Sequence, residues 1–117
     1  MADFTPAPIK PSVAIEALDI RVGTIERVEE IARSDKLMKL TVNFGDHSRT
    51  IIAGIKKERE NPLEIEGRQA LFAVNLEPRR MAAEISEGML FDIGYADGVT
   101  PVLSVPECPV PNGTRAG

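Results

Sequence analysis

The order of strand-like segments around short helix signals is the feature that most restricts the fold of this chain. Residues 40–44 alternate apolar and polar side chains, the pattern of a strand with one buried face. Residues 70–74 are apolar on both faces, which predicts the most buried strand. The complete set of strand-like segments is 19–31, 40–44, 49–53, 70–74, 88–94 and a short extra one at 99–105. The chain is therefore expected to be all-β.

Two short segments carry helix signals. Asn61 is a good N-cap, Pro62 fits the first helical position, and Gly67 is placed to end the helix. Near the N-terminus, Ser12 is predicted to cap a short helix with Ile15 on its apolar face. Neither segment is long enough to cover a sheet.

The first strand-like segment is long, and its alternation breaks after Val22. We predict that Gly23 absorbs this change of phase as a β-bulge in a strongly bent strand. Three strands, a short helix and two more strands match a five-stranded OB-fold Greek-key barrel, whose bent first strand pairs on two sides. A ferredoxin-like fold would need two substantial helices. An SH3-like barrel is the nearest alternative.

The length of 117 residues provides for one domain with a modest core. Residues 1–14 are proline-rich and are predicted to be a flexible lead, and residues 15–117 are predicted to form the domain. The tail from Val99 to Gly117 is expected to add a strand and a dimerisation arm. This arm would cover the barrel of a second copy and so bury its apolar side chains, namely Val102, Leu103, Val105 and Val110.

Several absences from the sequence indicate a cytoplasmic protein. No apolar run approaches the roughly 20 residues that span a bilayer, so no membrane insertion is expected. The N-terminus lacks the basic start and apolar middle of a signal peptide. Cys108 is the only cysteine and cannot form an internal disulfide.

Residues that could support catalysis or hold a metal are few. His47 is the only histidine and lies in a predicted turn, and Cys108 has no basic neighbour to activate its thiol. The sequence contains no zinc-ligand spacing, glycine-rich phosphate loop or nucleophile elbow. We therefore expect a binding protein that is not an enzyme and uses no metal or cofactor.

The polar loop at residues 75–87 carries the most informative pattern. Arg79 and Arg80 are predicted to lie at its tip, where guanidinium groups suit phosphate or carboxylate oxygens. Ser86 offers a hydroxyl group, and Gly88 allows a ligand to approach the backbone closely. The alternative is a solvated turn with two ordinary surface arginines.

These residues resemble the tRNA-binding OB-domain family. That family includes stand-alone structure-specific tRNA-binding proteins and domains appended to methionyl- and phenylalanyl-tRNA synthetases. The matching segments are Ser34 to Leu37, Asn75 to Arg80 and Ser86 to Leu90. Within the family, Leu18 to Ile25 and Pro109 to Thr114 resemble the CsaA type, which is described as a protein-secretion chaperone.

The resemblance implies a homodimer of OB barrels with a ligand surface on each subunit. Carried onto this chain, the positions that would face tRNA are Lys36, Asn75, Arg79, Arg80, Ser86 and Met89. The residues expected near a pocket for unfolded peptide are Phe72, Met81 and Met89. Methionine suits loosely specified ligands because it is flexible and polarizable, and Met89 as core filler is the alternative.

Charge separates the two functions that remain. The net charge of −4 opposes generic nucleic-acid binding, and Glu77 and Glu87 weaken the positive potential beside the arginines. We favour a CsaA-like chaperone for unfolded or presecretory polypeptides, with the export machinery as a further partner. The alternative is a stand-alone structure-specific tRNA-binding protein that acts on tRNA or in trans with an aminoacyl-tRNA synthetase.

Overall fold

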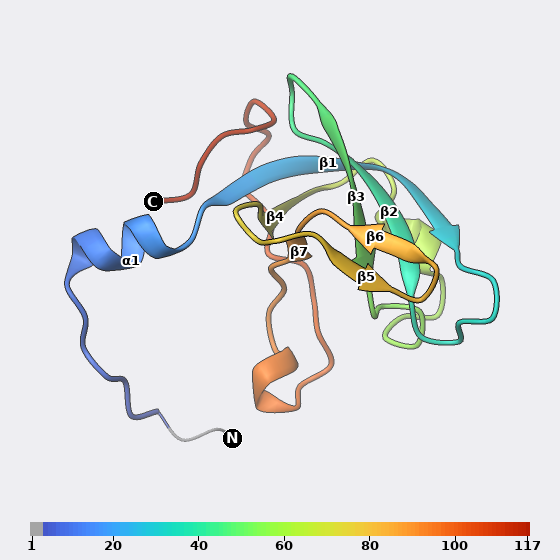
Figure 1. Cartoon of the computed structure of the whole chain (residues 1–117), viewed down its shortest axis with the longest axis horizontal. Coiled ribbons are helices and arrows are strands. Elements are labelled where there is room, and N and C mark those ends of the chain that lie inside the picture. The colour runs from blue at the N-terminus through green and yellow to red at the C-terminus, as the bar shows by residue number, and fades with distance from the viewer. Residues whose placement is uncertain (1–3) are drawn as a thin grey trace.

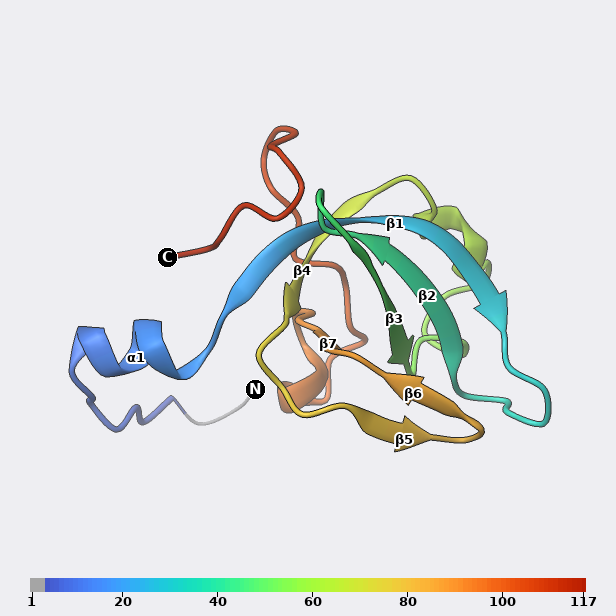
Figure 2. The same cartoon turned by 45° about the horizontal axis from the view of Figure 1, so that its top comes forward.

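A five-stranded antiparallel sheet dominates the computed structural model, which describes residues 4–117. The sheet curls into a half-barrel (Figure 1, Figure 2). This confirms the predicted all-β, five-stranded architecture of the OB type. In the spatial order β3-β2-β1-β4-β7, the strands are Ser48–Ala53, Met38–Asn43, Ile20–Glu30, Gln69–Ala73 and Met89–Leu90.

The strand β1 is bonded along both of its edges. Its first half, from Ile20 to Thr24, pairs with β4, and its second half, from Thr24 to Glu30, pairs with β2. The predicted two-sided pairing is therefore confirmed. The predicted place of the bulge is wrong, because the register shifts between Ile25 and Arg27 and not at Gly23.

Gly23 has a different role, which is to leave room for the core. A Cβ atom at this position would lie 2.5 Å from Val42 Cγ1 and 2.9 Å from Phe44 Cε1. Both neighbours are buried in the hydrophobic core. The core lies inside the curl of the sheet and is centred on Phe72, whose ring meets the ring of Phe44 edge-on at 5.6 Å.

Three short helices flank the sheet in the described part of the chain: α1 (Pro11–Ala17), η1 (Pro62–Ile65) and η2 (Tyr95–Asp97). Asn61 caps η1 as predicted, because its side chain accepts a hydrogen bond from Leu63 N. The element is a single 3-10 turn, and Ile65 on it is fully buried. Among the described residues, no helix has the length and apolar character needed to cross a membrane.

The start of α1 differs from the prediction. Lys10 occupies the N-cap position without a side-chain hydrogen bond, and Ser12 lies inside the helix. Pro11 is responsible, since its restricted φ is already suited to the first helical position. The helix therefore begins within the segment that was expected to be a flexible lead, of which residues 1–3 lie outside the described residues.

The predicted loop at residues 75–87 contains a β-hairpin. Its strands are β5 (Arg79–Met81) and β6 (Glu84–Ser86), and they form a separate two-stranded sheet. The turn between them passes through Ala82 with a φ of +55°. Alanine is uncommon in this left-handed region, so no glycine or asparagine turn signal marked the hairpin in the sequence.

The C-terminal tail is bonded to its own barrel rather than extended as a free arm. Val22 N donates to Thr114 O at 2.9 Å, and Ala116 N donates to Ile20 O at 2.8 Å. Gln69 Nε2 donates to Val110 O at 2.6 Å. The tail therefore covers the edge of its own β1, and its predicted role as a dimerisation arm stays a prediction.

The predicted strands at 88–94 and 99–105 are much shorter than expected. The first is reduced to β7, and the second to a single bridge between Ile93 and Val102. Leu103 is buried in its own barrel, whereas Val102 and Val105 remain exposed. Pro101 contributes to this result, because proline lacks the N–H group that a longer ladder requires.

The packing around Gly23 leads to a stability prediction. Gly23→Ala should destabilise the fold by about 1–3 kcal/mol, because the added methyl group overpacks a filled core. Gly54→Ala is the matched control, since the nearest atom to its Cβ is the flexible Lys36 Cε at 3.4 Å. Urea denaturation measures both. Equal stability of the two variants would contradict this account of Gly23.

Candidate functional site

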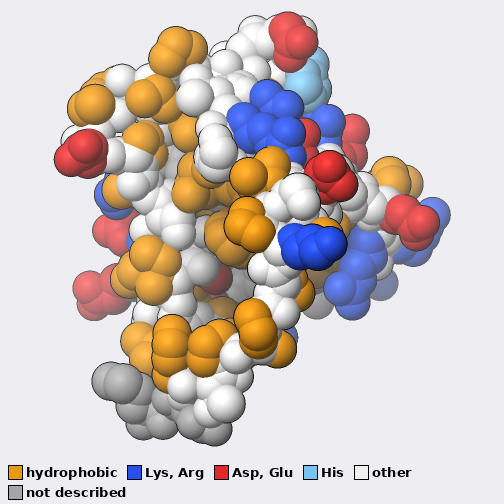
Figure 3. Space-filling model, turned by 90° about the vertical axis from the view of Figure 1, so that its left-hand side faces the viewer, with side chains coloured by type: hydrophobic (Ala, Val, Ile, Leu, Met, Phe, Trp, Pro, Cys, Tyr) orange, Lys and Arg blue, Asp and Glu red, His pale blue; other side chains and the backbone are white. Residues whose placement is uncertain are grey.

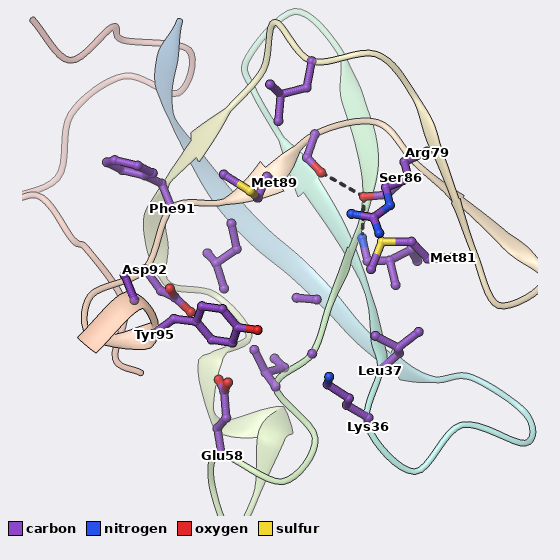
Figure 4. A pocket seen from close by; sticks show the side chains of 18 of the residues that line it. Lys36, Leu37, Glu58, Arg79, Met81, Ser86, Met89, Phe91, Asp92 and Tyr95 are labelled. Atoms are coloured by element: carbon purple, nitrogen blue, oxygen red, sulfur yellow. Dashed lines mark hydrogen bonds between the residues drawn. The ribbon is translucent and has the colours of Figure 1, made fainter. Parts of the chain in front are cut away.

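A cleft of about 620 Å³ lies between the β5–β6 hairpin, the β7–η2 segment and the chain that follows β3. Figure 4 shows labelled side chains of these elements around the cleft, together with Lys36 and Leu37 from the chain between β1 and β2. The lining is mainly apolar and includes Leu37, Met81, Met89 and Phe91. Met89 is 47% exposed, which favours its reading as a contact residue over core filler. A concave, mainly apolar surface of this kind is typical of a ligand-binding site.

The charges around this cleft are mixed. Lys36 and Arg79 are basic, and Glu58, Glu77 and Asp92 are acidic, so the lining carries a net formal charge of −1. A surface that reads a phosphate backbone needs a concentration of positive charge. The lining therefore suits an apolar ligand better than a polyanion.

Burial raises the pKa of Glu58, and the nearby charge of Asp92 raises it further, while Arg59 and Lys36 act in the opposite direction. Burial also raises the pKa of Asp92. Both carboxylates thus occupy a partly desolvated environment at one end of the cleft.

Ser86 does not present its hydroxyl group to a ligand. The side chain is buried, accepts a hydrogen bond from Ile52 N at 2.9 Å and donates one to Gly88 O at 2.8 Å. It ties β6 to β3 and so holds the hairpin at the wall of the cleft. Gly88 also packs closely against the protein, because a Cβ there would lie 2.8 Å from Ile51 Cδ1 and 2.9 Å from Ala73 O.

The side chain of Asn75 is also engaged within the protein. Its Oδ1 accepts from Asp19 N at 2.9 Å, and its Nδ2 donates to Ala17 O at 3.2 Å. These bonds join the end of α1 to the segment after β4. These bonds give Asn75 a structural role. Asn75 does not line the cleft, and its predicted contact with tRNA stays a prediction.

The two arginines point in different directions. Arg79 lies opposite Ser86 and lines the cleft, whereas Arg80 lies opposite Ile85 on the other face of the hairpin. Both are exposed, and no ion pair among the described residues involves either one. Placing them together at a loop tip was therefore wrong, because strand alternation separates them.

Of the other predicted contact residues, the structure brings Lys36, Met81 and Met89 together at the cleft. Phe72 is fully buried beneath it, so Phe72 is removed from the set of residues that touch a peptide. Its ring supports the core instead.

Sequence reasoning missed Glu58, Asp92 and Tyr95 as members of the cleft. Alternation along a strand would place Asp92 and Phe91 on opposite faces, but β7 ends at Leu90 and both residues line the cleft. The available signal was the pair Gly94 and Gly98, whose positive φ values of +112° and +70° bracket η2 and turn it toward the cleft.

A second hollow of about 460 Å³ lies beside the β2–β3 turn. Most of its polar groups are satisfied internally: Arg21 Nε donates to Asp19 at 2.6 Å, and Arg49 Nη1 donates to Val74 O at 2.7 Å. The hydrogen bond from Arg21 also lowers the pKa of Asp19. His47 accepts from Arg49 Nε at 2.9 Å, which agrees with a structural role for this histidine.

The role of Ser86 can be tested by removing its hydroxyl group. Ser86→Ala should lower the free energy of unfolding by about 1–3 kcal/mol, because Ile52 N loses its partner in a buried place. Ser48→Ala, on the exposed start of β3, is the control and should change stability by less than about 0.5 kcal/mol. Thermal or urea unfolding provides the measurement. A stable Ser86→Ala protein would contradict the structural role.

Comparison with known proteins places this geometry in a family. The family model described as "Putative tRNA binding domain" matches residues 20–115. The structure of a MetRS-related protein from Pyrococcus horikoshii is similar, with 32% identity, a TM-score of 0.84, and coverage of 95% of this chain and 100% of that chain.

Two CsaA chaperones have similar structures. The protein from Bacillus anthracis has 30% identity and a TM-score of 0.78, with 94% of this chain and 100% of that chain covered. The protein from Picrophilus torridus has 25% identity and a TM-score of 0.77, with coverage of 93% and 100%. The chain therefore belongs to the tRNA-binding domain family, whose members are typically non-catalytic binding proteins.

Proposed function

We propose that this chain is a cytoplasmic, CsaA-like and export-related chaperone that binds extended segments of unfolded polypeptide in the cleft. The observation that carries the proposal is the mainly apolar lining of a cleft of about 620 Å³. Burial of apolar side chains from a client would supply the binding free energy. The export machinery would then be a further partner.

Two features of the cleft suit clients of varied sequence. Met81 and Met89 line it, and the thioether side chain adapts its shape to different apolar groups. The names of two similar structures, the CsaA chaperones from Bacillus anthracis and Picrophilus torridus, support the same proposal.

Binding of tRNA is the second candidate function, favoured by the family match and by the hairpin. Arg79 and Arg80 are exposed on β5, and Lys36 lies on the facing side of the cleft. Arginine forks bind phosphate oxygens well. The net charge of −4 and the acidic residues of the cleft lower the expected affinity, so we rank this function second.

We also propose that the protein forms a homodimer through its terminal segments. The helix α1 has no buried residue, and Ile9, Val13 and Ile15 are exposed on and beside it. Arg115 connects this helix to the C-terminal tail by donating to Ile15 O at 2.6 Å. Figure 3 shows hydrophobic side chains gathered over the side of the molecule that carries α1. A second copy would cover this apolar surface.

The cleft is tested by shortening one of its contact residues. Met89→Ser should weaken the binding of a labelled, unfolded apolar peptide by about 5- to 10-fold, because a half-exposed methionine loses its apolar contact. Ile85→Ser is the control, since Ile85 is 50% exposed on the neighbouring β5–β6 hairpin but does not line the cleft. Fluorescence anisotropy measures both affinities. Equal losses for the two variants would contradict the assignment of the cleft.

The hairpin arginines are tested with tRNA over a salt series. In the Arg79→Ala, Arg80→Ala double variant, the slope of log K against log salt should flatten by about two units, one for each lost phosphate contact. For the native chain, tRNA affinity should fall roughly a thousandfold between 50 and 200 mM salt if six or more phosphates are contacted, while peptide affinity changes little. Tight tRNA binding at physiological salt without any peptide binding would reverse the ranking of the two functions.

The dimer is tested by light scattering. The native chain should have twice the monomer mass of 12.7 kDa, and Ile15→Asp should shift it to the monomer because a charge enters the apolar surface. Leu63→Asp is the control, since Leu63 has a similar exposure, 50% against 52%, on the distant η1. A dimer that tolerates Ile15→Asp as well as Leu63→Asp would exclude this interface.

A further inference from the structure

The segment before α1 is apolar and uncovered. We name residues 4–10 the proline segment; all of them are exposed, and Lys10 is the only charged residue among them. Phe4 is 90% exposed and Ile9 is 63% exposed. A run of apolar side chains in contact with water gains free energy when another surface covers it.

Three prolines hold this segment extended. Pro6, Pro8 and Pro11 each fix their own φ, and each keeps the residue before it out of the helical region. Lys10, which precedes Pro11, accordingly has a φ of −65° and a ψ of 138°, the dihedral angles of a polyproline II helix. A segment that is already extended loses little conformational entropy on binding, which favours its docking in a groove lined by aromatic rings.

The cleft offers such a groove. Phe91 and Tyr95 line it and are 40% and 72% exposed, so both rings are open to contact. Figure 4 shows the two rings on the same side of the cleft, with Met89 near Phe91. This wall of the cleft therefore has the aromatic and apolar character that a proline-rich segment recognises.

The proline segment is long enough to reach this wall. The end of α1 is held near the cleft, because Asn75 Nδ2 donates to Ala17 O at 3.2 Å and the next residue, Leu76, lines the cleft. The seven residues of α1 span roughly 10 Å. The proline segment spans roughly 22 Å as a polyproline II helix, so it can pass back along α1 and beyond it. Figures 1 and 2 both show the segment turning at the start of α1 toward η2, which begins with Tyr95.

We infer that the proline segment docks in the cleft of its own chain, with Phe4 and the rings of Pro6 and Pro8 against Phe91 and Tyr95. The exposed segment described above is then the open state of an equilibrium whose other state has the cleft closed. An unfolded polypeptide has to displace the segment before it can bind. The inference shares the cleft with the proposed function, but docking of the segment requires no client.

A tryptophan at position 4 measures docking, because the chain contains no tryptophan of its own. Phe4→Trp keeps an aromatic side chain at an exposed site. Acrylamide should quench this indole at least about twofold less than in a chain that also carries Tyr95→Ala, the result expected when half of the molecules or more are docked. Adding Leu63→Ala instead is the control, since Leu63 is exposed on the distant η1, and it should leave the quenching unchanged.

The shielding of the indole should not depend on protein concentration, since the segment and the cleft belong to one chain. Shielding that appears only at high concentration would assign the cleft to the segment of a second copy and overturn the inference. Equal quenching with and without Tyr95→Ala would overturn it too.

Competition with a labelled, unfolded apolar peptide connects docking to the proposed function. Phe4→Ser should tighten binding of this peptide at least about twofold, because the fraction of open clefts rises. Leu63→Ser is the matched control and should leave the affinity unchanged. Equal affinities of the native chain and the Phe4→Ser variant would overturn the inference and leave the proposed function intact. A shielded indole in a chain that binds no peptide, with or without Phe4→Ser, would support the inference and contradict the proposed function.

Discussion

The two-sided pairing of β1 is the constraint on which the rest of the structure depends. The strand bonds to β2 with its second half and to β4 with its first half, and it curves along its length (Figure 2). The bend curls the sheet and encloses the core around Phe72. It also leaves the backbone of β1 exposed along the stretch that the C-terminal tail then covers, with Thr114 and Ala116 bonded to it. Gly23 is needed because a side chain there would enter this core.

The cleft follows from how the hairpin is attached to this frame. The β5–β6 hairpin does not join the main sheet, so hydrogen bonds from side chains hold it in place. Ser86 joins it to β3, Glu87 bonds to Thr50 on the same strand, and Glu84 pairs with Lys39 on β2. These three polar contacts keep the hairpin beside β3 and leave an open apolar surface between it and the β7–η2 segment. Ser86, which the sequence suggested as a ligand contact, is thus one of the residues that hold the site together.

The position of the two hairpin arginines affects both proposed functions. Arg79 and Arg80 remain exposed and are suited to phosphate, but they lie on opposite faces of the hairpin, so a ligand in the cleft meets only Arg79. A folded RNA would have to contact both sides of the hairpin to use both charges. An extended peptide needs only the cleft, whose lining is mainly apolar. The same surface can thus distinguish the two ligand classes by shape as well as by charge.

The sequence by itself determined the strand order, the OB architecture and the family, because alternation at 40–44, the apolar run at 70–74 and the Asn61–Pro62 helix start are local patterns. It also identified Lys36, Met81 and Met89, which meet at the cleft. Only the tertiary structure decided that Ser86 and Asn75 are bonded internally, that Phe72 is buried, and that Glu58 and Asp92 share a site. The physical reason is that these roles depend on partners far away in the chain, such as Ile52, which is 34 residues from Ser86, and local patterns carry no information about such partners.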